Sequence, residues 1–239
     1  QNNSAGGDGG AIDHSSSDPL TVTSSAFVGN TAGTDAGNIG GSGGAIYHSG
    51  AILGPSAITA SYFFNNQVDN AESFDGGGAI YHGAGIMSIT STAFFGNNVD
   101  GDDAQGGAVF NNSSDDFAMT INYSHFGELL GVIIPPIPPI VVPGTSFDVV
   151  AALGANGAGN TVTGTTANTS GGGAIFNNGP LLITGTSFVS NSSSNHGGAF
   201  MNIASIGDPF PQPLGQQAII ANSTFTLNTA TIQGGAIQH

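Results

Sequence analysis

The sequence predicts an all-β fold, a right-handed parallel β-helix of about seven coils that forms one domain over residues 1–239. Two recurring motifs support this prediction. Gly-Gly-Ala followed by an apolar residue occurs seven times, and Phe-x-x-Asn falls between its copies while the intervening lengths vary. A repeat that contains only short strands cannot bury an apolar face alone, so its copies must stack into a solenoid.

The Gly-Gly-Ala motif is expected to be a tight turn that leads into a strand. Glycine adopts the positive φ angles that a tight turn requires, and the apolar residue after Ala reads as the start of a short strand. Equivalent strands of successive copies would then pair in parallel at about 4.8 Å. The copies begin at Gly9, Gly43, Gly77, Gly106, Gly172, Gly197 and Gly234.

The Phe-x-x-Asn motif is expected to close a second strand. A β-branched residue lies five positions before each Phe, and Ser or Thr lies two positions before it, which predicts one strand from the β-branched residue to the Phe. We expect these apolar residues to form interior columns, with the rings in one continuous stack. In the fourth copy Leu129 stands where the Asn is expected. The predicted core residues are Val22, Phe27, Ile58, Phe63, Ile89, Phe94, Ile121, Phe126, Ile183, Phe188, Ile220 and Phe225.

The spacing between motifs predicts a loop insertion at about 127–160. Successive motif alanines are 25 residues apart between Ala174 and Ala199, but 66 residues apart between Ala108 and Ala174. The long interval contains a Pro-rich segment at 134–140, and proline cannot donate to a strand ladder. Residues 140–165 could alternatively form one further degenerate coil.

The charge inventory excludes several classes of partner. The chain has 15 acidic residues and no Lys or Arg, so we expect no nucleic-acid binding and no docking on anionic lipid. It has no Cys, hence no disulfide, and no run of 18 apolar residues, so direct membrane insertion is not expected.

The Gly-Gly-Ala-[Ile/Leu/Val] and Phe-x-x-Asn motifs resemble the repeats of the polymorphic outer membrane protein family. The resemblance covers nearly the whole chain apart from the insertion. It implies a right-handed parallel β-helix that serves as a surface-exposed passenger or adhesin region. It also implies an extracellular or cell-surface location.

Two columns of side chains follow each motif Ala. The residue three positions later is always His or Asn, which indicates either a metal-binding column or a ladder of hydrogen-bonded side chains; we favour the ladder because carboxylates are scarce there. The residue two positions later is often aromatic and would stack within the wall or against sugars and proteins. The first column is His14, His48, His82, Asn111, Asn177, Asn202 and His239; the second is Asp13, Tyr47, Tyr81, Phe110, Phe176, Met201 and Gln238.

Carboxylates in one loop are candidates for a cation site or for catalysis. Asp100, Asp102 and Asp103 form a fragment of a calcium loop, so structural Ca²⁺ is the single cofactor that the sequence suggests. A carboxylate pair could also hydrolyse glycosides. Pectin-active β-helices commonly use Lys or Arg to hold an acidic sugar, and this chain has neither. We therefore assign no catalytic residue and expect a protein that is not an enzyme.

The strands at the two ends of the chain predict assembly. Gly-Gly-Ala-Ile-x-His occurs at both ends, and equivalent strands are the ones that stack, so we expect head-to-tail pairing into a filament. The partner is then a second copy, or neighbouring coils of a longer chain. The alternative is an adhesin that binds host, cell or glycan partners, and a polysaccharide-active enzyme is the third option. The assembly edges are Gly10, Ala11, Ile12 and His14, and Gly235, Ala236, Ile237 and His239.

Overall fold

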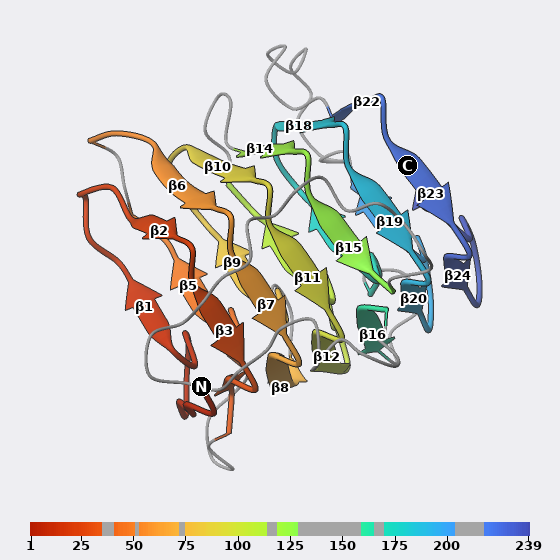
Figure 1. Cartoon of the computed structure of the whole chain (residues 1–239). Helices are drawn as coiled ribbons and strands as arrows, with labels where there is room; N and C mark the ends of the chain where they lie inside the picture. The colour runs from red at the N-terminus through yellow and green to blue at the C-terminus, as the bar shows by residue number, and fades with distance from the viewer. Residues whose placement is uncertain are drawn as a thin grey trace, which may run out of the picture.

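The computed structural model describes residues 1–34, 41–50, 53–71, 75–113, 119–128, 159–164, 170–203 and 218–239. These residues form a right-handed parallel β-helix with four all-parallel sheets along one rod, as predicted. The two termini lie at opposite ends of the rod (Figure 1). The 25 strands are all short, and no helix occurs in these ranges.

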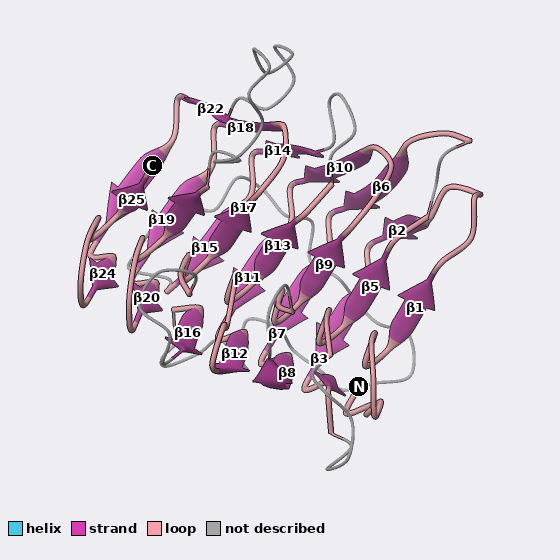
Figure 2. Ribbon diagram, turned by 180° about the vertical axis from the view of Figure 1, so that it is seen from behind, coloured by secondary structure: helices cyan, strands magenta, loops and turns pink. Residues whose placement is uncertain are grey.

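Each complete coil contributes one strand to each sheet, in chain order (Figure 2). Sheet 1 contains β1 (Ile12–His14), β5 (Ile46–His48), β9 (Ile80–His82), β13 (Val109–Asn111), β17 (Ile175–Asn177), β21 (Phe200–Asn202) and β25 (Ile237–Gln238). Sheet 2 contains β2 (Thr21–Thr23), β6 (Ser56–Thr59), β10 (Met87–Thr90), β14 (Met119–Asn122), β18 (Leu181–Thr184) and β22 (Ala218–Ala221). Sheet 3 contains β3 (Ala26–Val28), β7 (Tyr62–Phe64), β11 (Ala93–Phe95), β15 (His125–Gly127), β19 (Ser187–Val189) and β23 (Thr224–Thr226). Sheet 4 contains β4 (Thr31–Ala32), β8 (Gln67–Ala71), β12 (Asn98–Gly101), β16 (Thr161–Gly164), β20 (Ser192–Ser193) and β24 (Thr229–Ala230).

The first glycine of each Gly-Gly-Ala motif forms the corner before sheet 1. Gly43 has φ +67°, and a Cβ on it would lie 2.1 Å from the carbonyl oxygen of Ile46. No other residue fits there without moving the backbone, because both the left-handed conformation and the close contact exclude a side chain. This explains why the motif keeps its glycine in all seven copies.

The predicted single strand from the β-branched residue to the Phe is wrong. It is two strands, one in sheet 2 and one in sheet 3, separated by a corner residue with left-handed φ such as Ser91 at +49°. The hydroxyl two residues before each Phe stabilises this corner: Thr92 Oγ1 donates to the Thr90 carbonyl at 3.0 Å, and the Thr92 N–H donates to Ser124 Oγ at 3.3 Å. A polar side chain that bonds the local backbone favours a turn over a continuous strand.

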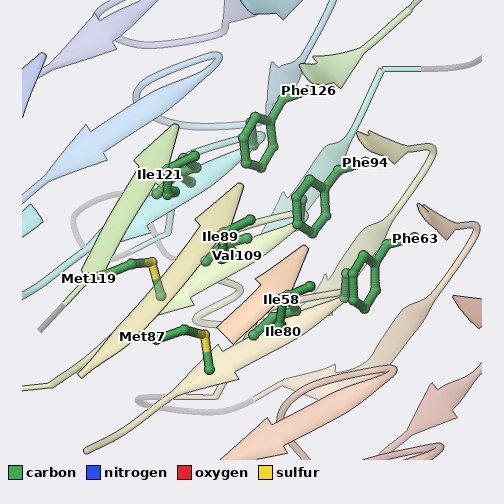
Figure 3. Packing of buried hydrophobic residues seen from close by; sticks show 14 of the residues in the cluster. Ile58, Phe63, Ile80, Met87, Ile89, Phe94, Val109, Met119, Ile121 and Phe126 are labelled. Carbon is green, nitrogen blue, oxygen red and sulfur yellow. The ribbon is translucent and has the colours of Figure 1, made fainter. Parts of the chain in front are cut away.

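The six phenylalanine rings form one continuous interior column, as the motif register predicted. Neighbouring ring centroids are 4.5–5.0 Å apart with interplanar angles of 4–10°. Figure 3 shows Phe63, Phe94 and Phe126 facing the isoleucine column of sheet 2 across the core. All twelve predicted core residues belong to this cluster, and Phe27, Ile220 and Phe225 are partly buried because they lie in the outermost coils.

The Asn side chains of the Phe-x-x-Asn motif form a second continuous ladder. In each interior coil the Asn Nδ2 donates both to the Oδ1 of the next Asn and to the Phe carbonyl of the preceding coil; for Asn66 these distances are 2.9 and 3.1 Å. Parallel stacking makes such ladders self-complementary. The ladder comprises Asn3, Asn30, Asn66, Asn97, Asn160, Asn191 and Asn228.

The fourth coil corrects the assignment of Leu129 as the residue that replaces the motif Asn. Asn160 occupies that position: its Nδ2 donates to Asn191 Oδ1 at 2.9 Å and to the Phe94 carbonyl at 3.1 Å. The insertion therefore separates Phe126 from its own ladder Asn. Residues 129–158, which contain the Pro-rich segment and Leu129, lie outside the described residues. Of the proposed extra coil at 140–165, Thr161–Gly164 is β16 and belongs to the fourth coil.

Candidate functional site: the polar column and the coil edges

The His/Asn column lies on the inner face of sheet 1. Along β5, Ile46 and His48 are fully buried, while the intervening Tyr47 points to the opposite face and is partly exposed. The alternation of side chains along a strand therefore settles which residues of the motif face inward. His48 Nε2 is 2.8 Å from Ser56 Oγ on β6, which places the imidazole inside the coil.

In the first three coils the column is a stack of imidazoles. The rings of His14 and His48 are parallel, with centroids 5.1 Å apart, and those of His48 and His82 are also 5.1 Å apart but tilted by 35°. The Nδ1 atoms of His48 and His82 approach to 3.2 Å, and His82 Nε2 lies 3.1 Å from the Gly85 carbonyl. Two nitrogens separated by this distance share a hydrogen bond, and there is no room for a metal ion between them.

In the following coils the same column is a chain of amides. Asn111 Nδ2 donates to Asn177 Oδ1 at 2.7 Å, and Asn177 Nδ2 donates to Asn202 Oδ1 at 2.7 Å. Asn202 Nδ2 lies 2.9 Å from His239 Nδ1, so the column continues to the residue that follows β25. This geometry favours the ladder over the metal column.

Two polar atoms of the column, one in the first coil and one at the junction between its two halves, lack hydrogen-bond partners within the described ranges. His14 Nδ1 and Asn111 Oδ1 are buried and have no hydrogen-bond partner within the described ranges. Burial lowers the pKa of His48 from its ordinary 6.5 to about 4, with a further contribution from the nearby His14 imidazole. Burial in the column therefore disfavours the imidazolium form of His48.

The aromatic column lies on the outer face of sheet 1. The rings of Tyr47 and Tyr81 stack at 5.0 Å and 11°, and Tyr81 meets Phe110 edge-on at 5.2 Å. Phe110, Phe176 and Met201 are nearly or fully buried and form a separate apolar cluster. The rings therefore contact one another along the rod axis, which supports the structural interpretation of this column.

Carboxylates gather near the exposed end of the aromatic column. Asp8, Asp13 and Asp75 all raise the pKa of the Tyr47 phenol, although burial is the larger cause. Asp8 accepts a hydrogen bond from the Ser42 backbone at 2.7 Å, and burial raises the pKa of its own carboxyl. These three carboxylates place negative charge near the Tyr47 ring.

Of the predicted calcium residues, Asp100 lies on β12, and Asp102 and Asp103 follow that strand. Asp100 accepts a hydrogen bond from Thr163 Oγ1 at 2.9 Å, and the Asp102 carbonyl accepts one from Ser170 Oγ at 2.9 Å. The structure does not bring Asp100, Asp102 and Asp103 together as a cation site: among the described residues, no three His, Cys, Asp or Glu side chains are placed to hold a metal ion.

The predicted assembly edges are the outermost strands of sheet 1. At the motif Ala and the residue after it, the backbone N–H groups point toward the following coil: those of Ala11 and Ile12 donate to the Ala45 carbonyl at 3.0 and 2.9 Å. At the other end, those of Ala199 and Phe200 donate to the Ala236 carbonyl. In this pattern the N–H groups of Ala236 and Ile237 point out of the C-terminal edge, and the Ala11 carbonyl points out of the N-terminal edge. At the N-terminal edge, β1 contains Ile12 and His14 and is preceded by Gly10 and Ala11. At the C-terminal edge, β25 contains Ile237, is preceded by Gly235 and Ala236, and is followed by His239.

Ser56 and His125 are among the buried polar residues that sequence reasoning missed. Ser56 bonds His48, but it occupies a position where the equivalent residues include Met87 and Met119, so no repeat signal marked it. His125 lies in sheet 3, outside the polar column, with Nδ1 2.6 Å from Ser187 Oγ and Nε2 2.8 Å from the Gly127 carbonyl. Burial lowers the pKa of His125. A lone His carries no periodicity from which burial could be predicted.

Comparison with known proteins gives a family match for the last coil. In the described ranges, no helix is long and apolar enough to cross a membrane. Searches of curated proteins and of solved structures found no significant match to the chain. Residues 222–239 match the family model described as the Chlamydia polymorphic membrane protein repeat, a family associated with the outer membrane and cell surface. The resemblance seen in the motifs is therefore confirmed for the last coil, whose sequence is similar to a polymorphic membrane protein repeat.

Proposed function

We propose that this chain is a non-enzymatic structural rod of the cell surface, and that its copies stack head to tail into a filament. The observation that carries the proposal is the complementarity of the two edges. N–H groups of Ala236 and Ile237 point out of one edge, and the carbonyl of the equivalent Ala11 points out of the other. Equivalent strands of adjacent coils are the ones that pair throughout sheet 1.

The Asn ladder is complementary in the same sense. The backbone N–H and Nδ2 of Asn191 donate to Asn228 Oδ1 at 3.0 Å each, so on Asn228 the same donors face the C-terminal edge. At the other edge Asn3 donates to Asn30 Oδ1, so the Oδ1 of Asn3 faces outward as an acceptor. A second copy joined at this edge would continue the ladder in one direction. Such a heterologous contact does not close, so it extends into a fibre.

Apolar surface at the C-terminal edge supports the same arrangement. Ile237 belongs to the isoleucine column of sheet 1, yet 42% of its surface is exposed, compared with 0% for Ile46 and Ile80. A further coil would bury it. The absence of Lys and Arg supports the non-enzymatic role, because the common recognition of acidic sugars by basic side chains is not available.

The test compares two variants of Ile237 in the chain of residues 1–239. Ile237→Pro removes the outward N–H without removing a donor to the chain's own coils, whereas Ile237→Val retains it along with most of the apolar contact. We expect the parent and Ile237→Val to elongate with concentration in sedimentation velocity and to form rods in electron micrographs, and Ile237→Pro to remain monomeric. A parent that stays monomeric at high concentration would contradict the filament and leave coils of a longer chain as the partner.

Adhesion through the side of the rod is the second function suggested by the sequence. The outer aromatic column gives it less support than the edges give to assembly. Tyr47 and Tyr81 direct their ring faces toward each other, and a sugar ring would need a free face for stacking. The rod has 15 negative charges and no Lys or Arg, so filament sides should repel one another, and salt or divalent cations should promote bundling.

A further inference from the structure

The four sheets do not contain the same number of layers. Sheet 1 has seven strands, and sheets 2, 3 and 4 have six each. Sheet 4 gains a seventh layer from the segment at Ser4, which forms a parallel bridge with Thr31 on β4, and the Thr31 N–H donates to the Asn3 carbonyl at 2.9 Å. Within the described residues, sheets 2 and 3 are therefore one layer shorter than sheets 1 and 4.

A head-to-tail junction between two copies of residues 1–239 inherits this difference. When β1 of one copy pairs with β25 of the preceding copy, the Ser4 segment pairs with β24 in the same way. The direct neighbour of β2 would be a strand that follows β25, whereas β22 follows β21 and lies one layer further away. The same holds for β3 and β23. Two strand spacings, about 9.6 Å, then separate β22 from β2 and β23 from β3, which is room for one strand in each sheet. We call this space the junction layer.

The backbone beside the junction layer is prepared for a further strand. The Gly185 N–H donates to the Ala221 carbonyl at 3.1 Å, so in the same pattern the N–H of the equivalent Asn222 points into the layer. The Thr186 N–H donates to Ser223 Oγ at 3.3 Å, so the N–H of Ser223 faces the position of a hydroxyl in the layer. An occupant with Ser or Thr at that position continues the hydrogen-bond pattern of the corner.

The side chains beside the junction layer specify two apolar positions. Ile220 and Phe225 are the last members of their columns and are partly buried, whereas Phe188, one coil earlier, is 0% exposed. On the other side of the layer the same two columns resume at Val22 and Phe27 of the next copy. A β-branched residue and a Phe five positions later would fill both columns, with the hydroxyl residue two positions before the Phe.

The charge of these sheets restricts the occupant further. The strands of sheets 2 and 3 contain no Asp or Glu, although the chain has 15 acidic residues. The two sides of the junction layer therefore bring no like charges together from these strands. A charged side chain on the inner face of the occupant would be buried against apolar columns without a partner. The occupant is thus an uncharged strand.

We propose that the junction layer binds an extended, uncharged segment of a separate polypeptide chain, which carries a β-branched residue, Ser or Thr three positions later and Phe five positions later. Such strand addition obtains its affinity from backbone hydrogen bonds and its specificity from the positions of alternate side chains. This proposal rests on the head-to-tail arrangement proposed above, and it adds the partner that completes the junction.

A peptide of residues 181–189 of this chain is the probe. These residues span β18 and β19 and contain Ile183, Thr186 and Phe188 in the required spacing. The control peptide exchanges Ser187 and Phe188, which keeps the composition but moves the ring to the other face of the strand. We expect the labelled probe to bind the chain of residues 1–239 in fluorescence anisotropy. In sedimentation velocity it should lower the protein concentration at which rods form by at least about tenfold, because burial of one Phe accounts for such a factor. The control should do neither. Equal effects of the two peptides, or no binding of the probe, overturn the proposal.

Two variants separate this proposal from the filament itself. Phe225→Ala keeps the edges of sheets 1 and 4 and should weaken probe binding by at least about tenfold. Ile237→Pro should stay monomeric and still bind the probe, because the edge of β22 and β23 is unchanged; circular dichroism checks that both variants are folded. Probe binding by a parent that never elongates would support the strand-binding edge and contradict the filament. A parent that elongates without taking up the probe would show that the copies close the junction themselves, and this overturns the strand-binding proposal alone.

Discussion

Asn97 and Asn160 are 63 positions apart in the chain, yet the Nδ2 of Asn97 donates to the Oδ1 of Asn160 at 2.9 Å, the same distance as between Asn66 and Asn97. The ladder is therefore geometrically continuous across the insertion. A hydrogen-bonded neighbour on each side fixes Asn160 wherever the preceding segment runs. The insertion behaves as an addition to a coil that is otherwise regular.

Removing the insertion should leave the fold intact. Deletion of residues 129–159 joins Glu128 to Asn160 and restores the spacing Phe-x-x-Asn; Glu128→Gly supplies the glycine that coil three has at Gly96, where φ is +58°. A shorter closed loop costs less entropy, so the free energy of unfolding should stay constant or rise by up to about 2 kcal/mol. Circular dichroism and thermal unfolding measure this. Loss of β structure in the deletion variant would show that the insertion is required for folding.

The position of a phenylalanine along the column should determine the cost of its removal. Phe94 is fully buried between two stacked rings, with centroids at 4.9 and 4.5 Å, so Phe94→Ala should lower the free energy of unfolding by about 3–5 kcal/mol. Phe225 is partly buried and stacks on Phe188 alone among the described residues, so Phe225→Ala should cost less than half as much. Denaturant titration compares them. Equal losses would mean that the column is not the main source of interior stability.

The stability of the chain should decrease in acid through His48. Its pKa is lowered to about 4 by burial and by His14, whereas an unfolded histidine titrates near 6.5, so the unfolded chain binds more protons between these values. The contribution is fully present above about pH 6.5 and is lost as the pH falls toward 4, to a total of up to about 3 kcal/mol. Denaturant titrations at several pH values across this range give the free energy of unfolding as a function of pH. Its dependence on pH should be weaker for His48→Asn than for the parent. An identical pH dependence of the free energy of unfolding in both proteins would show that His48 does not cause it.

The sequence by itself determined the repeat, the stacking and the composition of the interior. Glycine at the corner before sheet 1, Phe in the core and Asn three residues later recur in register, and parallel stacking converts each recurrence into a column. A residue whose neighbours in the preceding and following coils are of the same type can be placed in its column from the sequence alone. The predicted stack from Phe27 to Phe225 followed from this alone.

Tertiary structure decided what the repeat pattern could not express. The corner at Ser91 has no fixed residue type, since Ala60, Tyr123 and Gly185 take the same left-handed conformation, so the strand break was invisible in the sequence. Asn160 looked unrelated to Phe126 because the chain between them is long, and only the hydrogen bonds to Phe94 and Asn191 reveal its coil. The hydrogen bonds of His48 and His82 are made to Ser56 and Gly85, which lie on other parts of the coils. Such contacts are set by the three-dimensional closure of each coil, which no local pattern encodes.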